Sequence, residues 1–406
     1  MKLTEITAQR FRSLYNVTLP LKPLNIIAGP NGSGKSNLIR LLRFVRDIAA
    51  DPQASLQYRD VARELVWYGQ EEGRKVDRFN VALTFTYLQE PCRALQYAAD
   101  VSTSGGELTF EREVLADPSN SGNVYLSRTE RRAEIWEKEE DGKRPPIFTI
   151  APHILALQYL SPLTDSPAVQ STQRSIGGWR FPAVDTGEVR KSTLTTMRPE
   201  RVPELASNAG NLSEFLYALQ ADKPDDLAEI VERLCNAIEF LEDVTVEAHP
   251  SLLGTGAEVR YQLFERAFAN AITPDSASDG TLRLLALLAL LLGDRSPSLI
   301  CLEEPNHNLH PHLMLHLADA MRYVAASKEP RPQLIVTTHS PDFLDCFRPE
   351  SEADYLNVFV AHKDPQTGKT NFRLVDSAQL AHWLEEYRLG ELHRMGLLDS
   401  YARGER

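Results

Sequence analysis

Alternating apolar and polar positions mark the first part of the chain. Three short runs within residues 2–28 alternate with a period of two, which predicts β-strands. Residues 35–50 carry apolar side chains at helical spacing, which predicts a helix. Residues 79–88 and 107–114 return to the strand pattern. Because each of these later runs has one apolar and one polar face, we expect them to form an antiparallel subsheet.

The middle of the chain has a different character. Residues 115–150 are charged and turn-rich, and residues 161–207 hold many Pro, Ser, Thr and Gly residues. The second stretch predicts a long loop or mobile lid. Residues 211–242 have apolar positions at helical spacing and predict helices.

The later half alternates buried strands with helices. Residues 282–292 predict a buried helix, 299–302 a short strand, 313–324 an amphipathic helix and 334–336 another buried strand. Apolar strands separated by helices are typical of a parallel sheet covered by helices. The sequence therefore predicts an α/β protein with a mixed central sheet, an antiparallel subsheet and a helical insertion.

Length and composition narrow the class of protein. A chain of 406 residues suggests two or three domains. The four cysteines are scattered, without a CxxC pair, which argues against a zinc ribbon or a disulfide framework. The start MKLTEITAQRFRSL lacks the apolar core of a signal peptide, and the apolar run Leu284–Leu292 is too short to cross a bilayer. We expect a cytoplasmic protein that does not contact membranes.

The net charge of −12 bears on nucleic-acid binding. A protein that grips DNA over a broad surface usually has a basic face. The dense basic region here is interleaved with six acids, and we interpret it as a solvated helix face rather than a DNA-binding stripe. Its basic residues are Arg128, Arg131, Arg132, Lys138, Lys143 and Arg144.

The stretch AGPNGSGKSNL, residues 28–38, contains the pattern G-x-x-x-x-G-K-[ST]. Glycines let successive backbone N–H groups turn toward phosphate oxygens. Lys35 supplies a charge for the β- and γ-phosphates, and the Ser36 hydroxyl can complete a Mg²⁺ shell. A plain glycine turn is the alternative, but the strand before and the helix after favour a phosphate loop. The predicted nucleotide-binding positions are Gly29, Pro30, Asn31, Gly32, Ser33, Gly34, Lys35, Ser36 and Asn37.

Two acids follow an apolar run in SLICLEEPNHNLHP, residues 298–311. Glu303 can hold Mg²⁺ through water, and Glu304 can orient the attacking water in phosphoryl transfer. An ordinary strand-to-loop junction is the alternative. His307, His310 and His312 follow without the cysteines or spacing of a zinc site, so we interpret them as turn and helix-capping residues.

A histidine ends another apolar run, in LIVTTHSPDFLD. His339 falls at the carboxyl edge of the predicted strand, where ligands bind in such sheets. There it can contact the γ-phosphate or the attacking water.

A second anion site is predicted in SASDGTLRLLALLALLL, residues 276–292. Ser278 and Gly280 introduce an apolar helix, whose N-terminus offers free N–H groups and a hydroxyl. One nucleotide does not need two such sites. We therefore expect this one to serve a nucleotide held by a second copy of the chain, so that two chains enclose two ATP molecules.

Together these motifs resemble those of ABC-type ATPase heads, and most closely the RecF-like and OLD-like AAA ATPases of bacteria. GPNGSGKS, SDGTLR, LEEP with NLHP, and TTHS stand in the order typical of that group. The resemblance implies ATP and Mg²⁺ as cofactors, Lys35 and Ser36 as Walker A residues, and Glu303 as the Walker B acid. It implies catalytic roles for Glu304 and His339.

The resemblance also assigns residues outside these motifs. It implies that Ser278 and Gly280 form the signature that reaches across a dimer. Arg12, within Phe11–Ser13, falls where the group approaches the base or ribose, and Asn308 falls in the loop that couples the two sites.

The chain departs from transporter patterns at three places. Glu303 stands where transporters have aspartate, and Asp279 where they have glycine or serine. No glutamine is assigned to the Q-loop, for which Gln89 and Gln158 are both candidates.

The resemblance implies a division of the chain and a function. We expect residues 1–160 and 250–406 to form one ATPase head, with a loop and helical insertion at 161–249. About 65 residues follow His339, too few for the Toprim nuclease domain of OLD enzymes. The leading hypothesis is an ATPase that dimerises on ATP and gates a separate effector, a nuclease in phage defence or DNA maintenance. The alternatives are a RecF-like repair ATPase that clamps DNA itself and a slow nucleotide-dependent scaffold.

Overall fold

The structure is a computed structural model of the chain. It describes residues 1–71, 73–87, 94–119, 123–136, 145–195, 201–250, 256–293 and 297–404. Its contacts divide the chain into two compact units, of which the first contains residues 1–179, 356–380 and 395–406. The second contains residues 180–355 and 381–394. The expected division into a head and an insertion at 161–249 remains a prediction.

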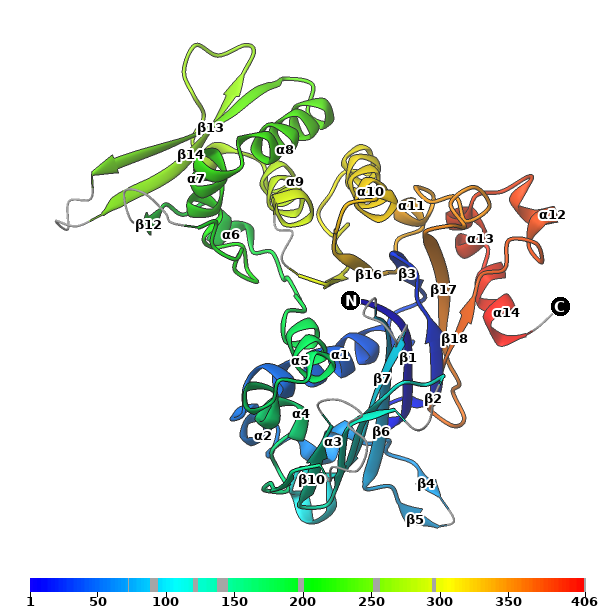
Figure 1. The fold of residues 1–406 in the computed structure, drawn as a ribbon. Helices are drawn as coiled ribbons and strands as arrows, with labels where there is room; N and C mark the ends of the chain where they lie inside the picture. Colours follow the sequence, from blue (N-terminus) through cyan, green and yellow to red (C-terminus); the bar gives the residue numbers. More distant parts are fainter. Residues whose placement is uncertain are drawn as a thin grey trace. The chain divides into compact units, whose positions relative to one another are not determined.

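An eight-stranded antiparallel sheet, in the order β11-β10-β9-β8-β7-β6-β1-β2, lies in the first unit (Figure 1). The predicted subsheet is thus confirmed, and the alternating side chains Val81, Leu83, Phe85 and Tyr87 are all buried. The strands are β1 (Lys2–Phe11), β2 (Leu14–Pro20), β6 (Arg78–Thr86), β7 (Ala94–Ser102), β8 (Thr109–Ala116), β9 (Val124–Thr129), β10 (Arg132–Ile135) and β11 (Ile147–Thr149).

The first unit also holds three strands that meet around the glycine-rich loop. β3 (Leu24–Ala28) pairs in parallel with β17 (Leu356–Lys363), which pairs antiparallel with β18 (Thr370–Leu374). The predicted helix after the loop is confirmed as α1 (Lys35–Ala50). The remaining elements are α2 (Ala54–Gln57), α3 (Ala62–Leu65), β4 (Gln70–Glu71), β5 (Arg74–Lys75), η1 (Ser104–Gly106), α4 (Ala156–Leu160), η2 (Ser161–Leu163), α5 (Pro167–Gly177) and α14 (Leu397–Arg403).

The prediction of a long loop over residues 161–207 is wrong for its first part, and residues 196–200 lie outside the described residues. α5 occupies part of this stretch although its sequence, PAVQSTQRSIG, is poor in strong helix formers. The helix packs beside α1 (Figure 1), with Val169 and Ile176 fully buried. Gln173 Nε2 also donates to the carbonyl oxygen of Ala49 at 2.9 Å. Tertiary packing therefore overrides the local propensity.

The interpretation of the basic region as a helix face is also wrong for its described part. Residues 124–135 form the strands β9 and β10, and the Arg128 side chain is completely buried. Its Nη1 lies 2.8 Å from Oε1 of Glu113, which is equally buried. Lys138, Lys143 and Arg144 lie outside the described residues.

The buried Glu113–Arg128 pair is fully hydrogen-bonded. The Glu113 carboxylate also accepts from Tyr97 Oη at 3.1 Å and from the backbone N–H of Ala156 at 2.7 Å. The Arg128 guanidinium donates to carbonyl oxygens, including those of Glu130 and Ala151. Such saturation offsets the cost of removing two charges from water. Burial beside Glu113 raises the pKa of Tyr97 well above its usual value, so this phenol stays protonated.

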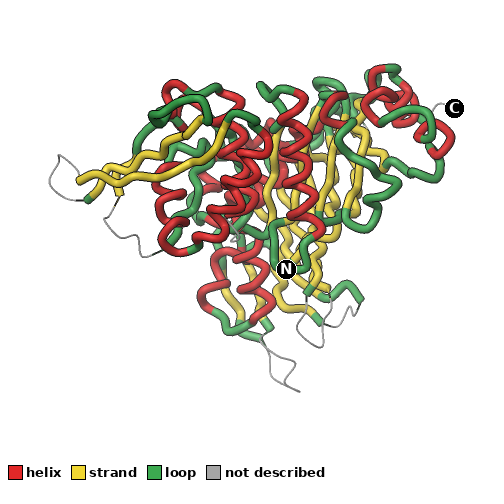
Figure 2. The backbone as a smooth tube through the Cα atoms, turned by 90° about the horizontal axis from the view of Figure 1, so that it is seen from above, coloured by secondary structure: helices red, strands yellow, loops and turns green. Residues whose placement is uncertain are grey.

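The second unit contains a three-stranded sheet in the order β12-β14-β13 with helices beside it. Both views show the β13–β14 ribbon extending beyond those helices (Figures 1 and 2). The predicted helices at 211–242 are α7 and α8, but α8 ends at Ala237, and residues 241 and 242 already belong to β13. The elements are α6 (Thr186–Val189), β12 (Thr193–Thr195), α7 (Leu212–Asp222), α8 (Pro224–Ala237), β13 (Leu241–Pro250) and β14 (Ala257–Glu265).

The later part of the second unit confirms the predicted alternation of strands and helices. β15 (Leu299–Glu303) and β16 (Gln333–Thr338) pair in parallel, with Glu303 opposite Thr337. The helical elements are η3 (Pro274–Ser276), α9 (Asp279–Leu288), the π-helical turn η4 (Ala289–Gly293), α10 (Pro311–Ala326), α11 (Pro341–Leu344), α12 (Ala381–Leu384) and α13 (Leu389–Arg394). Among the described residues, no helix is both long and apolar enough to span a bilayer.

The buried pair gives a stability prediction. Replacing Arg128 by Met leaves the Glu113 charge buried without its cation, which typically costs about 3–5 kcal/mol. We expect urea denaturation to show a fall of this size in the free energy of unfolding. The control is Arg132→Met, which removes an exposed pair with Glu134 and should cost less than about 1 kcal/mol. Equal losses in the two variants would contradict the assigned role of the pair.

Candidate functional site

The glycine-rich loop lies between β3 and the start of α1. Lys35 is the first residue of α1, and its side chain is buried. Its Nζ donates to the carbonyl oxygens of Gly29 at 2.5 Å and Pro30 at 3.0 Å. The loop thus curls around its own lysine at a helix N-terminus, which is the end that attracts anions. This geometry suits the phosphates of a nucleotide.

Two glycines of the loop are required by their neighbours. A Cβ atom at Gly34 would lie 2.1 Å from Thr370 Oγ1, and one at Gly29 would lie 2.5 Å from the carbonyl oxygen of Ala361. Both glycines also have positive φ angles, 103° and 146°. Gly32 has φ 80° but open space where a Cβ would be. The loop therefore packs directly against β17 and β18.

A chain of hydroxyl and amide groups holds the start of α1. Asn37 Nδ2 donates to Ser13 Oγ at 2.7 Å, and Thr370 Oγ1 lies 2.7 Å from the same oxygen. Thr370 Oγ1 is also 3.0 Å from the carbonyl oxygen of Ser33. Thr370 lies in no motif of the sequence, so no local pattern signals its contact with the loop. Pro30, Asn31, Gly32 and Ser36 remain exposed.

Arg12 follows β1 with a left-handed backbone, φ 48°. Its Nη2 lies 3.5 Å from Glu64 Oε2, and its buried Nε has no hydrogen-bond partner within the described part of the chain. The adjacent Phe11 is fully buried against Phe44 and Phe79, so its ring belongs to the core. A contact of Arg12 with the base or ribose remains a prediction.

Glu304 and His339 are brought together in the second unit. His339 Nδ1 lies 2.8 Å from Glu304 Oε1, and the backbone N–H of His339 donates to Oε2 at 3.2 Å. Glu304 has φ 46°, and its own N–H bonds the carbonyl oxygen of Thr337 at 3.0 Å. When Nδ1 donates to the carboxylate, the neutral ring keeps Nε2 as an acceptor. Both oxygens of this carboxylate are therefore held in place at the edge of the β15–β16 pair.

Oxygen ligands suited to Mg²⁺ are present at the predicted positions. Ser36 exposes a hydroxyl in the first turn of α1, and Glu303 exposes a carboxylate at the end of β15. Hydroxyl and carboxylate oxygens are ligands that Mg²⁺ prefers. Each of the two residues by itself therefore offers an oxygen of the kind that this ion binds.

One of the histidines after β15 caps a helix, as interpreted from the sequence. His310 is the N-cap of α10, and its Nδ1 accepts from the backbone N–H of His312 at 3.3 Å. Among the described residues, no three His, Cys, Asp or Glu side chains cluster as a metal site would require.

Ser278 is the N-cap of α9. Its Oγ accepts from the backbone N–H of Thr281 at 3.1 Å and lies 2.8 Å from Thr281 Oγ1. Asn308, with φ 60°, lies beside this helix start, because a Cβ at Gly280 would be 3.6 Å from its carbonyl oxygen. The structure thus brings the predicted signature and the predicted coupling loop together within the second unit.

Of the two candidates for the Q-loop glutamine, the structure describes one. Gln89 lies outside the described residues. Gln158 lies on α4, where its Oε1 is buried without a hydrogen-bond partner in the described structure. The Q-loop remains unassigned.

Asp279 has a partner that the sequence analysis missed. Its Oδ1 lies 2.6 Å from Arg190 Nη2. Hydrogen bonds from Arg190 and Thr186 hold the pKa of this carboxyl below its usual value. No local pattern signals a pair whose members are 89 positions apart.

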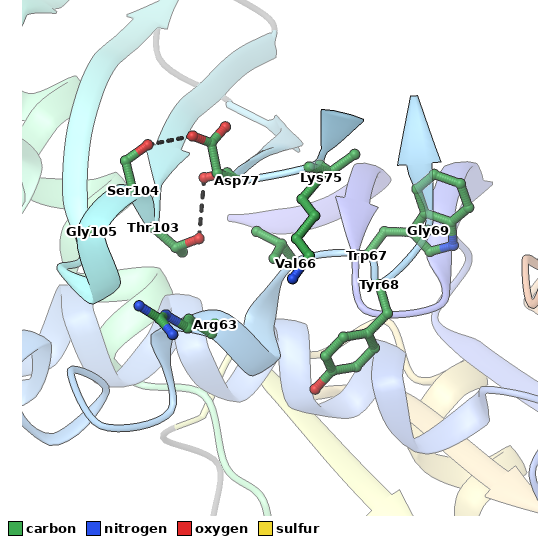
Figure 3. A pocket seen from close by; sticks show the side chains of 11 residues that line it. Arg63, Val66, Trp67, Tyr68, Gly69, Lys75, Asp77, Thr103, Ser104 and Gly105 are labelled. Atoms are coloured by element: carbon green, nitrogen blue, oxygen red, sulfur yellow. Dashed lines mark hydrogen bonds between the residues drawn. The ribbon is translucent and has the colours of Figure 1, made fainter. Parts of the chain in front are cut away.

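Described residues of the first unit line several cavities, two of which are large. One, of about 540 Å³, borders Pro30–Ser33 on one side and the β17–β18 turn with Arg403 on the other. The second, of about 630 Å³, is lined by Trp67, Tyr68, Arg63 and Lys75 (Figure 3). Its residues come from the segment around α3 to β6 and the turn after β7, and none belongs to the phosphate loop.

Comparison with known proteins places the chain in a family. Residues 24–145 and 178–345, more than half of the chain, match the family model described as "AAA domain, putative AbiEii toxin, Type IV TA system". The chain is 21% identical over 361 residues to the Old nuclease of Escherichia phage P2, covering 85% of this chain and 57% of that protein. It is also 21% identical over 402 residues to the OLD nuclease of Thermus scotoductus, covering 96% of this chain and 67% of that protein.

A solved structure supports the fold. The head domain of Smc, crystallised with the C-terminal winged-helix domain of ScpA, matches with a TM-score of 0.55 at 14% identity. The match covers 94% of this chain and 100% of the Smc head. The expected fold, an α/β head of the ABC-ATPase type, is thereby confirmed. The chain belongs to the AAA domain family that its two segments match, as an ABC-type ATPase of the OLD-like group.

Proposed function

We propose that the protein binds ATP with Mg²⁺ and hydrolyses it to ADP and phosphate. The observation that carries this proposal is the Glu304 carboxylate, which both the side chain and the backbone N–H of His339 hold. A loop that only binds a nucleotide needs no oriented carboxylate. Hydrolysis needs one, because the attacking water must lose a proton.

The phosphate loop supplies the binding half of this activity. Lys35 exchanges the carbonyl oxygens of Gly29 and Pro30 for β- and γ-phosphate oxygens, while loop N–H groups and the N-terminus of α1 face the same anion. Ser36 and Glu303 are the ligands that we assign to Mg²⁺. When bound, this ion neutralises charge that develops on the phosphate oxygens.

Glu304 and His339 supply the chemical half. Glu304 accepts the proton of the attacking water, and the bond from His339 Nδ1 keeps that carboxylate oriented. Nε2 of His339 can accept a hydrogen bond from the same water. Because Glu304 takes up the proton that leaves the water, neither Glu304 nor His339 needs a proton from another group at this step.

We further propose that two chains close around two ATP molecules. Ser278 and Gly280 supply the second anion site to the nucleotide of the other copy, and Asn308 beside Gly280 couples the two sites. A separate effector, a nuclease, responds to closure. Both OLD relatives are named nucleases and are longer than this chain, which supports an effector of that class.

In the alternative function, the chain itself clamps DNA through the basic region, but Arg128 of that region is not available as a DNA contact. Arg128 is buried and bonded to Glu113, so it cannot reach a phosphate backbone. The described structure gives no observation that favours this function over ATP-driven gating.

The packing of the loop predicts unequal effects of two glycine substitutions. Gly34→Ala drives a Cβ into Thr370 and should abolish binding of a fluorescent ATP analogue. Gly32→Ala, the matched control, meets only the strain of a positive φ, about 1–2 kcal/mol, so measurable binding should remain. Equal loss of binding in both variants would show that the strain of a positive φ, and not the clash with Thr370, abolishes binding.

Glu304→Gln separates binding from chemistry. The amide keeps the size of the side chain but cannot take a proton, so ATP should still bind while hydrolysis falls about 10²–10⁴-fold. Phosphate release under saturating ATP measures this. Glu350→Gln, an exposed control in the same unit, should hydrolyse ATP normally. A Glu304→Gln protein with the wild-type rate would place the base elsewhere.

A mixing experiment tests the dimer. Ser278→Arg should leave ATP binding intact but block closure, whereas Lys35→Ala should lose ATP binding. A mixed dimer contains one site built from two unaltered halves, so hydrolysis should reappear when the two inactive variants are combined. If Ser278→Arg hydrolyses ATP normally as a monomer, the two-chain arrangement is wrong.

A further inference from the structure

The turn that leads into α9 is held from the outside. The turn of residues 274–277, which includes η3, leads to Ser278, the N-cap of α9. Two arginines from other segments of the second unit bind this turn. Arg190 follows α6, and Arg260 lies on β14. The turn immediately precedes Ser278, so whatever holds it also sets the position of the Ser278 hydroxyl.

Arg190 makes three contacts, two with this turn and one with the first residue of α9. Its Nη1 donates to the carbonyl oxygen of Ala277 at 3.0 Å and to that of Pro274, and its Nη2 lies 2.6 Å from Asp279 Oδ1. Its side chain is only 22% exposed. These acceptors lie on both sides of Ser278. A planar guanidinium can bind several acceptors in a fixed arrangement, which a single ammonium cannot do.

The three-stranded sheet contacts both the segment that carries Arg190 and the turn that Arg190 binds. Tyr261 on β14 is fully buried, and its hydroxyl donates to the carbonyl oxygen of Val189, next to Arg190, at 3.0 Å. The neighbouring Arg260 pairs with Asp275 of the turn. Leu263 and Ile272 exchange backbone hydrogen bonds at 2.9 and 2.7 Å. A displacement of β14 would therefore move Arg190 and the turn together.

We propose that Arg190 is a positioning residue for Ser278 and the N-terminus of α9. Through it, the β12–β14–β13 sheet sets whether this chain can complete the nucleotide site of a second copy. The contact also explains why an acid, Asp279, stands directly after Ser278: it is the anchor for Arg190. This inference rests on the proposed two-chain function, which it extends to regulation.

The test compares Arg190→Ala, Arg190→Lys and the matched control Lys191→Ala. Lys191 is the next residue and pairs only with Glu188 on the surface among the described acids. We expect Arg190→Ala to lower kcat at least tenfold and to lose ATP-driven dimerisation, measured by light scattering. Its affinity for a fluorescent ATP analogue should stay within twofold of wild type. Arg190→Lys should retain more activity than Arg190→Ala, and Lys191→Ala should match wild type.

Complementation separates positioning from a general loss of structure. Mixing Arg190→Ala with Lys35→Ala should restore hydrolysis, because one site then joins an unaltered phosphate loop to an unaltered Ser278 turn. A chain that is merely misfolded would not be rescued by a partner that cannot bind ATP. If Arg190→Ala does not fold, Asp279→Ala removes the carboxylate that Arg190 Nη2 contacts, and we expect a lower kcat with unchanged ATP affinity and the same rescue on mixing.

The outcomes distinguish this inference from the proposed function. Wild-type protein that neither hydrolyses ATP nor dimerises with it would overturn the proposed function. Active wild-type protein with an equally active Arg190→Ala variant would overturn the role of Arg190 alone. Loss of ATP binding in step with turnover, without rescue on mixing, would reduce Arg190 to a structural residue.

Discussion

The close packing of the glycine-rich loop on β17 and β18 is the constraint on which the candidate site depends. No side chain fits at Gly34, because Thr370 occupies the space where a Cβ would project. The same threonine binds the loop carbonyl of Ser33 and the hydroxyl of Ser13. The loop is thus shaped by strands that follow it by more than 320 residues, and the buried Lys35 takes its place inside that shape.

In the second unit, contacts with segments distant in sequence likewise hold the start of another helix, α9. Ser278 caps α9 through a local bond to Thr281, but the turn before it is held by Arg190 and Arg260 from distant segments. Glu304 is likewise local to its strand yet oriented by His339 from the next one. In each case a short motif supplies the reacting group, and a contact distant in sequence fixes its direction.

The sequence could predict the features that a short motif or a local apolar period encodes, but not the contacts between distant segments. The loop, α1 and β6 are encoded locally by glycine spacing or apolar period, and they lie where predicted. Arg128 was misinterpreted because nearby acids suggested a solvated helix, whereas its partner Glu113 lies on the adjacent strand. α5 was missed because packing on α1 stabilises it rather than its composition. Thr370 and Arg190 lie in no recognisable pattern, and only the folded chain shows their partners.

The dependence of the loop on Thr370 has a consequence for biosynthesis. During synthesis the glycine-rich loop leaves the ribosome before the strands that shape it have been made. Until β18 has emerged, Lys35 and the loop carbonyls lack the surface against which they are ordered. Domains generally fold as units during synthesis, so nucleotide capture by this unit waits until β18 has been translated.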